Sequence, residues 1–126
     1  MAKKRTKKDN PEILYDSIIK GIQEKKGKNI VSLDLKKLNN SVTDYFIVCN
    51  GNSTTQVLSI ADSIQDEVMA LTGIKPWHKE GLINAEWVLL DYANIVVHIF
   101  QESSRNFYQI EKLWADAEIN QIETIE

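Results

Sequence analysis

EWVLLDYANIVVHIF, residues 86–100, consists of two short apolar segments separated by a turn. The segments 86–91 and 95–100 have the length and composition of β-strands, and residues 92–94 between them have the length of a hairpin turn. We therefore expect two antiparallel strands that are neighbours in one sheet.

This hairpin carries large side chains on more than one face. Trp87 and Leu89 alternate onto one face of the first strand, and His98 and Phe100 onto one face of the second. Whether the two pairs share a face depends on the register of the strands, which the sequence alone leaves open. A hairpin that is apolar on both faces is either a central pair of strands or the docking surface for a partner.

Further strands are expected upstream of the hairpin. Residues 29–35, NIVSLDL, alternate in the manner of a strand, and residues 43–50, TDYFIVCN, are apolar almost throughout, as in a strand covered on both faces. Residues 74–81, IKPWHKEG, are short and extended, and Pro76 restricts them to an edge strand or to none.

Three segments have helical periodicity. The first begins at Pro11 and ends near residues 25–27; the second begins with a capping box at residues 53–56 and ends at Gly73; the third is capped by Ser103 or Ser104. Their apolar stripes consist of Leu14, Ile18 and Ile22, widened by Tyr15 and Ile19; of Val57, Ile60, Ala61, Ile64, Val68 and Leu71; and of Phe107, Ile110, Leu113, Trp114 and Ala117.

The elements follow in the order α-β-β-α-(β)-β-β-α. A chain of 126 residues has material for one core. We therefore expect an α/β (α+β) fold, with a mixed sheet of four to five strands and helices packed on it. The expected organisation is a basic flexible arm at 1–10, a single domain at 11–117 and an acidic tail at 118–126.

The net charge of −3 conceals an asymmetry along the chain. Residues 1–10 hold five of the fifteen basic residues, whereas residues 11–126 carry ten basic and seventeen acidic groups. An acidic body is a poor general binder of nucleic acid, so a protein partner, and a basic one, is favoured. The arm is either a disordered, solubilising terminus or a contact to RNA.

Signals for membranes or export are missing from the sequence. No apolar run approaches the roughly 20 residues that span a bilayer, and no apolar segment follows the basic start. The lone Cys49 excludes an intramolecular disulfide. The expected location is the cytoplasm, without a membrane.

The sequence offers little to a catalytic or metal site. Cys49 lies within an apolar strand, where cysteine behaves as a small buried hydrophobe, and His98 is expected to be a packed strand residue rather than a base. His78 and Glu80 supply two metal ligands, but a catalytic zinc needs three. We expect no catalytic residue, no metal and no cofactor.

A glycine turn before a helix is the main alternative. Residues 51–53, Gly-Asn-Ser, join a strand to a helix N-terminus, which is a place where phosphate binds in nucleotidyltransferases. Those enzymes also need clustered aspartates, and Glu86 and Asp91 lie about 16 Å apart along a strand, too far to share one ion. A turn with an N-cap explains the same residues, and a nucleotide-binding or nucleotidyltransferase-like enzyme is the competing hypothesis.

Several strings together resemble one known family, the ribosomal silencing factors or Iojap family. They span about residues 11–117, and the strings at 86–92 and 96–100 followed by Tyr-x-x-Glu-x-Leu-Trp at 108–114 are a specific combination. The other matching segments are 42–47 with 51–53, 80–81 and 105–107.

The resemblance implies a fold related to nucleotidyltransferases but without their catalytic aspartates. It implies a non-enzymatic repressor that binds ribosomal protein fourteen of the large ribosomal subunit, blocks joining of the small subunit and damps translation; organellar relatives resemble assembly factors. Trp87 matches the family's contact tryptophan. The further contact residues expected from the family are Leu89, Asp91, His98 and Phe100.

Two features depart from the family. Residues 1–10 match nothing fixed in it, so contact of this arm with ribosomal RNA is a hypothesis. Ala93-Asn94 stands where relatives commonly have Gly-Asp, a turn that Asn can maintain because it tolerates positive φ. A homodimer that hides the apolar face in the free protein is a further possibility.

Overall fold

The computed structural model describes residues 11–38, 43–113 and 116–122. Its helices are α1 (Pro11–Glu24), α2 (Thr54–Thr72), α3 (Glu102–Tyr108) and α4 (Ile110–Leu113). Its strands are β1 (Lys28–Asp34), β2 (Tyr45–Gly51), β3 (His78–Glu80), β4 (Trp87–Asp91), β5 (Ile95–Gln101) and β6 (Glu118–Ile122). No helix in these described ranges is long and apolar enough to cross a membrane.

The strands form one mixed sheet in the order β3-β4-β5-β2-β1-β6. β2 and β5 are parallel, and every other neighbouring pair is antiparallel. The expected mixed α/β fold and the antiparallel β4–β5 hairpin are therefore confirmed. β3 is an edge strand, which is the position that Pro76 leaves open.

The sheet has six strands, not the four to five expected. The additional strand, β6, lies in the segment expected to be an acidic tail, and it pairs with β1 from Glu118 to Ile122. EINQI has only two apolar residues and so gives a weak strand signal. The unpaired edge of β1 nevertheless offers backbone hydrogen bonds, and Ile122 packs against the core.

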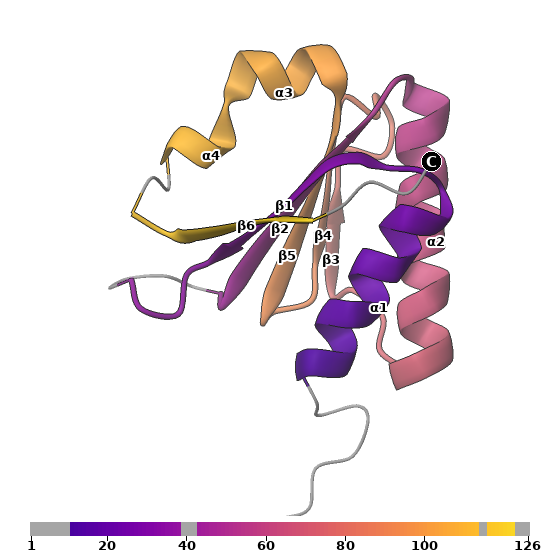
Figure 1. The fold of residues 1–126 in the computed structure, drawn as a ribbon. Helices are drawn as coiled ribbons and strands as arrows, with labels where there is room; N and C mark the ends of the chain where they lie inside the picture. Colours follow the sequence, from indigo (N-terminus) through magenta and orange to yellow (C-terminus); the bar gives the residue numbers. More distant parts are fainter. Residues whose placement is uncertain (1–10, 39–42, 114–115, 123–126) are drawn as a thin grey trace, which may run out of the picture.

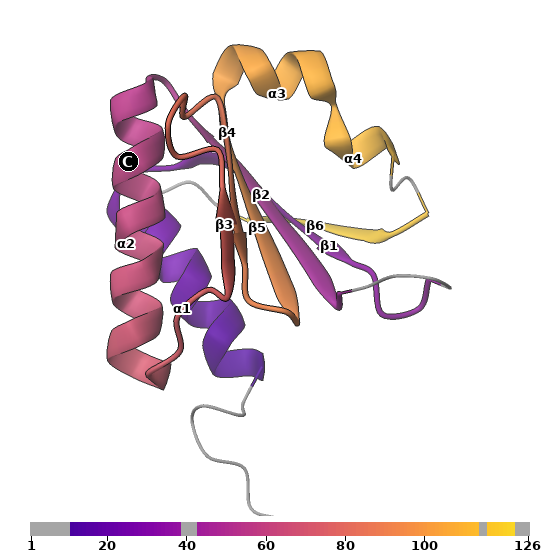
Figure 2. The ribbon, with the colours of Figure 1, turned by 180° about the vertical axis from the view of Figure 1, so that it is seen from behind.

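α1 and α2 lie side by side on one face of the sheet (Figures 1 and 2). The expected stripe of α1, Leu14, Ile18 and Ile22, is buried against that face, together with the inward residues of α2. The prediction for α2 fails at Leu71, which is 39% exposed, because Thr72 and not Leu71 continues the buried stripe one turn after Val68.

Both ends of α2 are capped as the sequence predicts, except that the Gln56 side chain accepts from Asn52 and not from the N-cap Ser53. Ser53 is the N-cap and accepts a hydrogen bond from the backbone of Gln56, while the Gln56 side chain accepts from the backbone of Asn52. Gly73 ends the helix in the left-handed conformation, with φ of 73°. These caps place the first turn of α2 directly after the end of β2.

α3 and α4 lie on the opposite face of the sheet, at the end where β5 leads into α3 (Figure 1). The single last helix that we expected is divided at Gln109, which is left-handed. Neither Ser103 nor Ser104 is the N-cap, because β5 runs directly into the helix and Gln101 takes that position without a side-chain cap. Trp114 lies outside the described residues.

Candidate interaction surface

The register of the hairpin brings all five expected contact residues onto one face of the sheet. Trp87 is paired with Phe100, Leu89 with His98 and Asp91 with Val96. Because directly paired residues of antiparallel strands point to the same side, Trp87, Leu89, Asp91, His98 and Phe100 share the face opposite α1 and α2. We call this the hairpin face.

Trp87 is the centre of an aromatic cluster on the hairpin face. Its ring stacks on Phe100 with centroids 4.9 Å apart and contacts Tyr108 of α3 at 5.0 Å. Its indole Nε1 donates a hydrogen bond of 3.0 Å to Nδ1 of His98. These contacts hold a half-buried tryptophan in one orientation, and a rigid aromatic of this kind suits an interface anchor.

His98 is neutral in this environment. Burial lowers the pKa of its imidazole to about 4, and Asp91 opposes that shift only in part. Since Nδ1 accepts the indole hydrogen bond, the proton of the neutral ring lies on Nε2. Nε2 is buried and has no hydrogen-bond partner among the described residues. His98 therefore acts as a packed acceptor for Trp87, consistent with the expectation that it is not a base.

Two of the five expected contact residues are buried. Phe100 is 0% exposed and His98 is 3% exposed, so neither offers surface to a partner in this conformation. The sequence could not show this, because their burial depends on Trp87 lying over Phe100 and on Phe46 packing against His98, with centroids 4.6 Å apart. Trp87, Leu89 and Asp91 are half-buried and keep part of their surface exposed.

Asp91 also shapes the hairpin turn. Its Oδ1 accepts a hydrogen bond of 2.7 Å from the backbone of Ala93. The positive φ that we expected Asn94 to tolerate is taken by Ala93, at 72°. The Asp91 hydrogen bond compensates for that unfavourable alanine conformation, which preserves the turn.

The structure adds to the hairpin face three residues that the sequence did not assign to it. Tyr108, 47% exposed, borders the hairpin face through its contact with Trp87. From the neighbouring edge strand, Glu80 is paired with Leu89 and His78 with Asp91, so both point to the same face. The His78 ring and the Glu80 carboxylate are 2.9 Å apart. Glu80 and Tyr108 lie within the family strings, whereas the sequence singled out His78 only as one of two metal ligands with Glu80.

Two backbone N–H groups at the Gly51-Asn52-Ser53 turn, those of Asn52 and Gln56, are engaged within the protein. The backbone of Asn52 donates to Oε1 of Gln56 at 2.7 Å, and Ser53 caps α2. Burial raises the pKa of the nearby Cys49 thiol to about 12, so this cysteine stays protonated at neutral pH. The described ranges hold no group of three or more His, Cys, Asp or Glu placed to bind a metal.

Comparison with known proteins assigns the chain to a family. The family model described as ribosomal silencing factor during starvation matches residues 7–126. The ribosomal silencing factor of Bacillus subtilis is 42% identical over 94 residues, which cover 75% of this chain and 78% of that protein.

A solved structure and a more distant relative support the same family. The crystal structure of protein CV0518 from Chromobacterium violaceum has a TM-score of 0.79 and 34% identity, covering 84% of this chain and 87% of that one. A mouse protein named for mitochondrial assembly of the ribosomal large subunit is 30% identical over 74 residues, 57% of this chain and 32% of that protein. The family expected from the hairpin strings is thereby confirmed: the chain belongs to the ribosomal silencing factors, the family of Iojap.

Proposed function

We propose that this protein binds the large ribosomal subunit through ribosomal protein fourteen and sterically blocks joining of the small subunit, so that translation is repressed. The observation that carries the proposal is the register of β4 and β5. It places Trp87, Leu89 and Asp91 on the one face of the hairpin that α1 and α2 leave open.

The contacts of Trp87 support its role as the anchor. The indole is fixed by Phe100, Tyr108 and His98, so little side-chain freedom remains to be lost on binding. Its partly exposed surface lies beside Leu89, and an aromatic next to an aliphatic residue is the usual composition of an interface hot spot.

Acidic groups around the hairpin face favour a basic partner. Asp91 lies on the face itself, Glu80 points to the same side from β3, and Glu86 immediately precedes β4. Complementary charge speeds association and sets orientation. A basic ribosomal protein meets this requirement better than ribosomal RNA, whose phosphates these carboxylates repel.

Assembly of the large subunit is a related role for the same surface. The mouse relative is named for mitochondrial assembly of the ribosomal large subunit. Binding to the same subunit would serve either role, and the two are distinguished by whether the protein acts on mature or on immature particles.

The proposed action is non-enzymatic and located in the cytoplasm. The competing hypothesis, nucleotide binding at Gly51–Ser53, is disfavoured by the internal hydrogen bonds of that turn. Calorimetric titration with ATP and magnesium tests it directly. We expect no binding, and saturable magnesium-dependent binding would support the enzyme hypothesis.

Two further partners remain predictions. The arm at residues 1–10, outside the described residues, is proposed to contact ribosomal RNA, and deletion of residues 1–10 tests this by its effect on the salt dependence of subunit binding. A homodimer of the free protein through the hairpin face would compete with ribosome binding, and light scattering over a range of concentrations detects it.

The proposal is tested by co-sedimentation of the purified protein with separated large and small subunits, followed by addition of the missing subunit. We expect selective binding to the large subunit and a reduced yield of joined ribosomes. Equal binding to both subunits, or unchanged joining despite saturation, would contradict it.

The Trp87→Ala variant tests the surface. We expect it to weaken large-subunit binding by about 2 kcal/mol or more, close to 30-fold. Trp77→Ala is a matched control, since Trp77 is 74% exposed and precedes the edge strand β3. Circular dichroism must show both variants folded. Equal losses in the two variants, or none in Trp87→Ala, would move the contact away from the hairpin face.

A further inference from the structure

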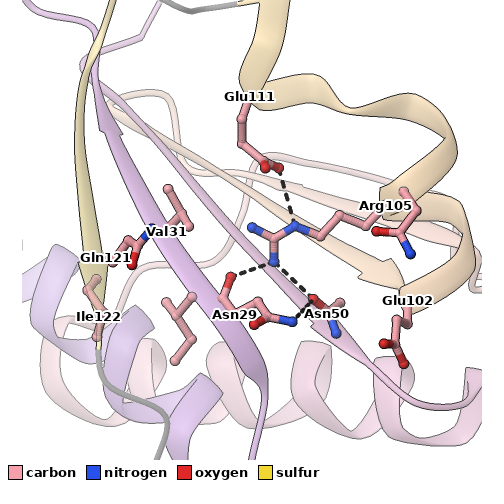
Figure 3. A pocket seen from close by; sticks show the side chains of 10 residues that line it. Asn29, Val31, Asn50, Glu102, Arg105, Glu111, Gln121 and Ile122 are labelled. Atoms are coloured by element: carbon pink, nitrogen blue, oxygen red, sulfur yellow. Dashed lines mark hydrogen bonds and ion pairs between the residues drawn. The ribbon is translucent and has the colours of Figure 1, made fainter.

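A polar cavity of about 500 Å³ lies between the α3–α4 segment and the sheet (Figure 3). Its walls come from β1, β2, α3, α4 and β6, at the end of the sheet where the parallel strands β2 and β5 finish. In sheets of this kind ligands bind beyond the carboxyl ends of parallel strands, and the volume lies in the range of small-molecule sites.

Arg105 is the central charged group of this cavity and is only 9% exposed. Its Nη1 donates to the backbone oxygen of Asn29 and, at 3.0 Å, to Oδ1 of Asn50. Its Nε donates to Glu111 at 3.2 Å. Figure 3 shows the guanidinium held between Glu111 on one side and the two asparagines on the other.

The remaining nitrogen of Arg105, Nη2, makes no hydrogen bond within the described residues. Asn50, 1% exposed, also lines the cavity, and its Nδ2 has no partner among them either. A guanidinium whose position is set by three acceptors and whose Nη2 keeps its donors for a ligand suits a carboxylate.

The charges of the walls narrow the class of ligand. Glu102 and Glu111 line the cavity together with Arg105, so its formal net charge is −1. A phosphate dianion would be repelled by the two carboxylates, and a simple cation would leave the free donors of Arg105 without an acceptor. A zwitterion has no net charge and offers a carboxylate to Arg105 and an ammonium to a glutamate.

The other walls of the cavity are suited to a zwitterionic ligand that carries a short polar side chain. Asn106 and Gln121 contribute amides, which donate and accept, and Ile122 and Val31 contribute an apolar surface. We propose that this cavity binds a free α-amino acid, with its carboxylate on Nη2 of Arg105 and its ammonium facing Glu102, because Glu111 is already paired with Nε of Arg105.

The site is separate from the hairpin face, although α3 carries residues of both. Arg105 lies in the cavity, and Tyr108, one helical turn further along, contacts Trp87. The inference does not depend on the proposed function, because amino-acid binding is measured on the free protein. Its failure would leave ribosome binding untouched.

The test is titration of the full chain with each of the common L-amino acids, followed by calorimetry and by NMR of side-chain amide and guanidinium signals. We expect saturable binding of at least one polar amino acid, with shifts in the Arg105 and Asn50 signals. The N-acetyl derivative lacks the ammonium and the α-amide lacks the carboxylate, and each should bind about tenfold more weakly or worse. Inorganic phosphate should not compete.

Variants locate the site. Glu102→Gln changes an exposed wall residue without touching the contacts of Arg105, and we expect it to weaken binding about tenfold while the fold is retained. Arg105→Lys keeps the charge but not the fork of donors and should abolish measurable binding; its folding is checked by circular dichroism.

Asp62→Asn, on α2 across the sheet, is the control. The proposal is overturned if no amino acid binds, if phosphate binds instead, or if Glu102→Gln and Asp62→Asn bind alike.

Discussion

Trp87 and His98 depend on each other at the scale of single residues. The indole N–H needs an acceptor in a partly buried place, and His98 supplies it only while its ring is neutral. Burial maintains that state by lowering the pKa of His98 to about 4. Trp87 is therefore oriented by a group whose protonation would remove the acceptor of the indole N–H.

This arrangement predicts a pH dependence of stability. The unfolded chain protonates His98 below about pH 6.5, whereas the folded chain keeps it neutral down to about pH 4. The unfolded state then binds more protons, so the free energy of unfolding falls as the pH drops through this window, by at most about 3 kcal/mol. Urea titrations at a series of pH values measure it. His98→Gln should lose this part of the slope, and identical slopes in both proteins would show that His98 contributes nothing.

At the scale of elements, α1 and α2 are held close by a glycine. A Cβ built on Gly21 would lie 2.6 Å from the Cα of Ile64, and the Ser63 hydroxyl donates a hydrogen bond of 2.8 Å to the Gly21 backbone oxygen. The two helices thus touch backbone to backbone at this point, which lets both lie flat on the sheet.

The Gly21→Ala variant distinguishes the effect of helix propensity on stability from the effect of helix packing. Propensity alone would make the alanine variant more stable by roughly 0.5–1 kcal/mol. The steric conflict with Ile64 leads us to expect a net loss of about 1–3 kcal/mol in the free energy of unfolding. Asp66→Ala, exposed on α2, is the control and should change stability by no more than about 0.5 kcal/mol. A more stable Gly21→Ala protein would refute the close contact.

The N-terminus of α2 makes a second prediction at this scale. Ser53→Ala removes the acceptor of the Gln56 backbone N–H, so we expect a loss of about 1 kcal/mol by thermal or urea unfolding. Thr55→Ala changes an exposed residue in the same turn without a cap and should have less effect. Similar losses in both variants would mean that the cap adds nothing beyond local propensity.

At the scale of the whole molecule, β6 is the edge strand on one side of the sheet and covers the edge of β1. β6 pairs with β1 over five residues, and Ile122 packs against the core. Its other side chains are exposed, so β6 stabilises the sheet chiefly by its backbone hydrogen bonds. Without β6, β1 would become an open edge.

Deletion of residues 118–126 tests this role. We expect a lower free energy of unfolding and association that increases with concentration, because the exposed edge of β1 can pair with a second chain. Urea unfolding and light scattering measure the two effects. Lys37→Ala is the control: it removes only the exposed ion pair of Lys37 with Glu118, 3.1 Å long, and should cost less than about 1 kcal/mol. A truncated protein that is monomeric and fully stable would show that β6 is dispensable.

The sequence by itself determined the family and most local elements, but not β6 or the division of the last helix at Gln109. The capping box at Ser53–Gln56 and the terminal Gly73 delimited α2, and the two apolar strings of the hairpin were correct as neighbouring strands. A cap, a turn or an alternating pattern involves residues only a few positions apart. Such local features can therefore be predicted from the sequence.

Only the tertiary structure decided which residues meet. The register of β4 and β5 placed Trp87 over Phe100, which buried one expected contact residue and left another half-exposed. The pairing of β6 with β1 and the cavity around Arg105 join segments more than 70 positions apart. A shift of one residue in register moves every side chain of a strand to the other face of the sheet. The register therefore depends on which elements cover each face, and a local sequence pattern does not contain that information.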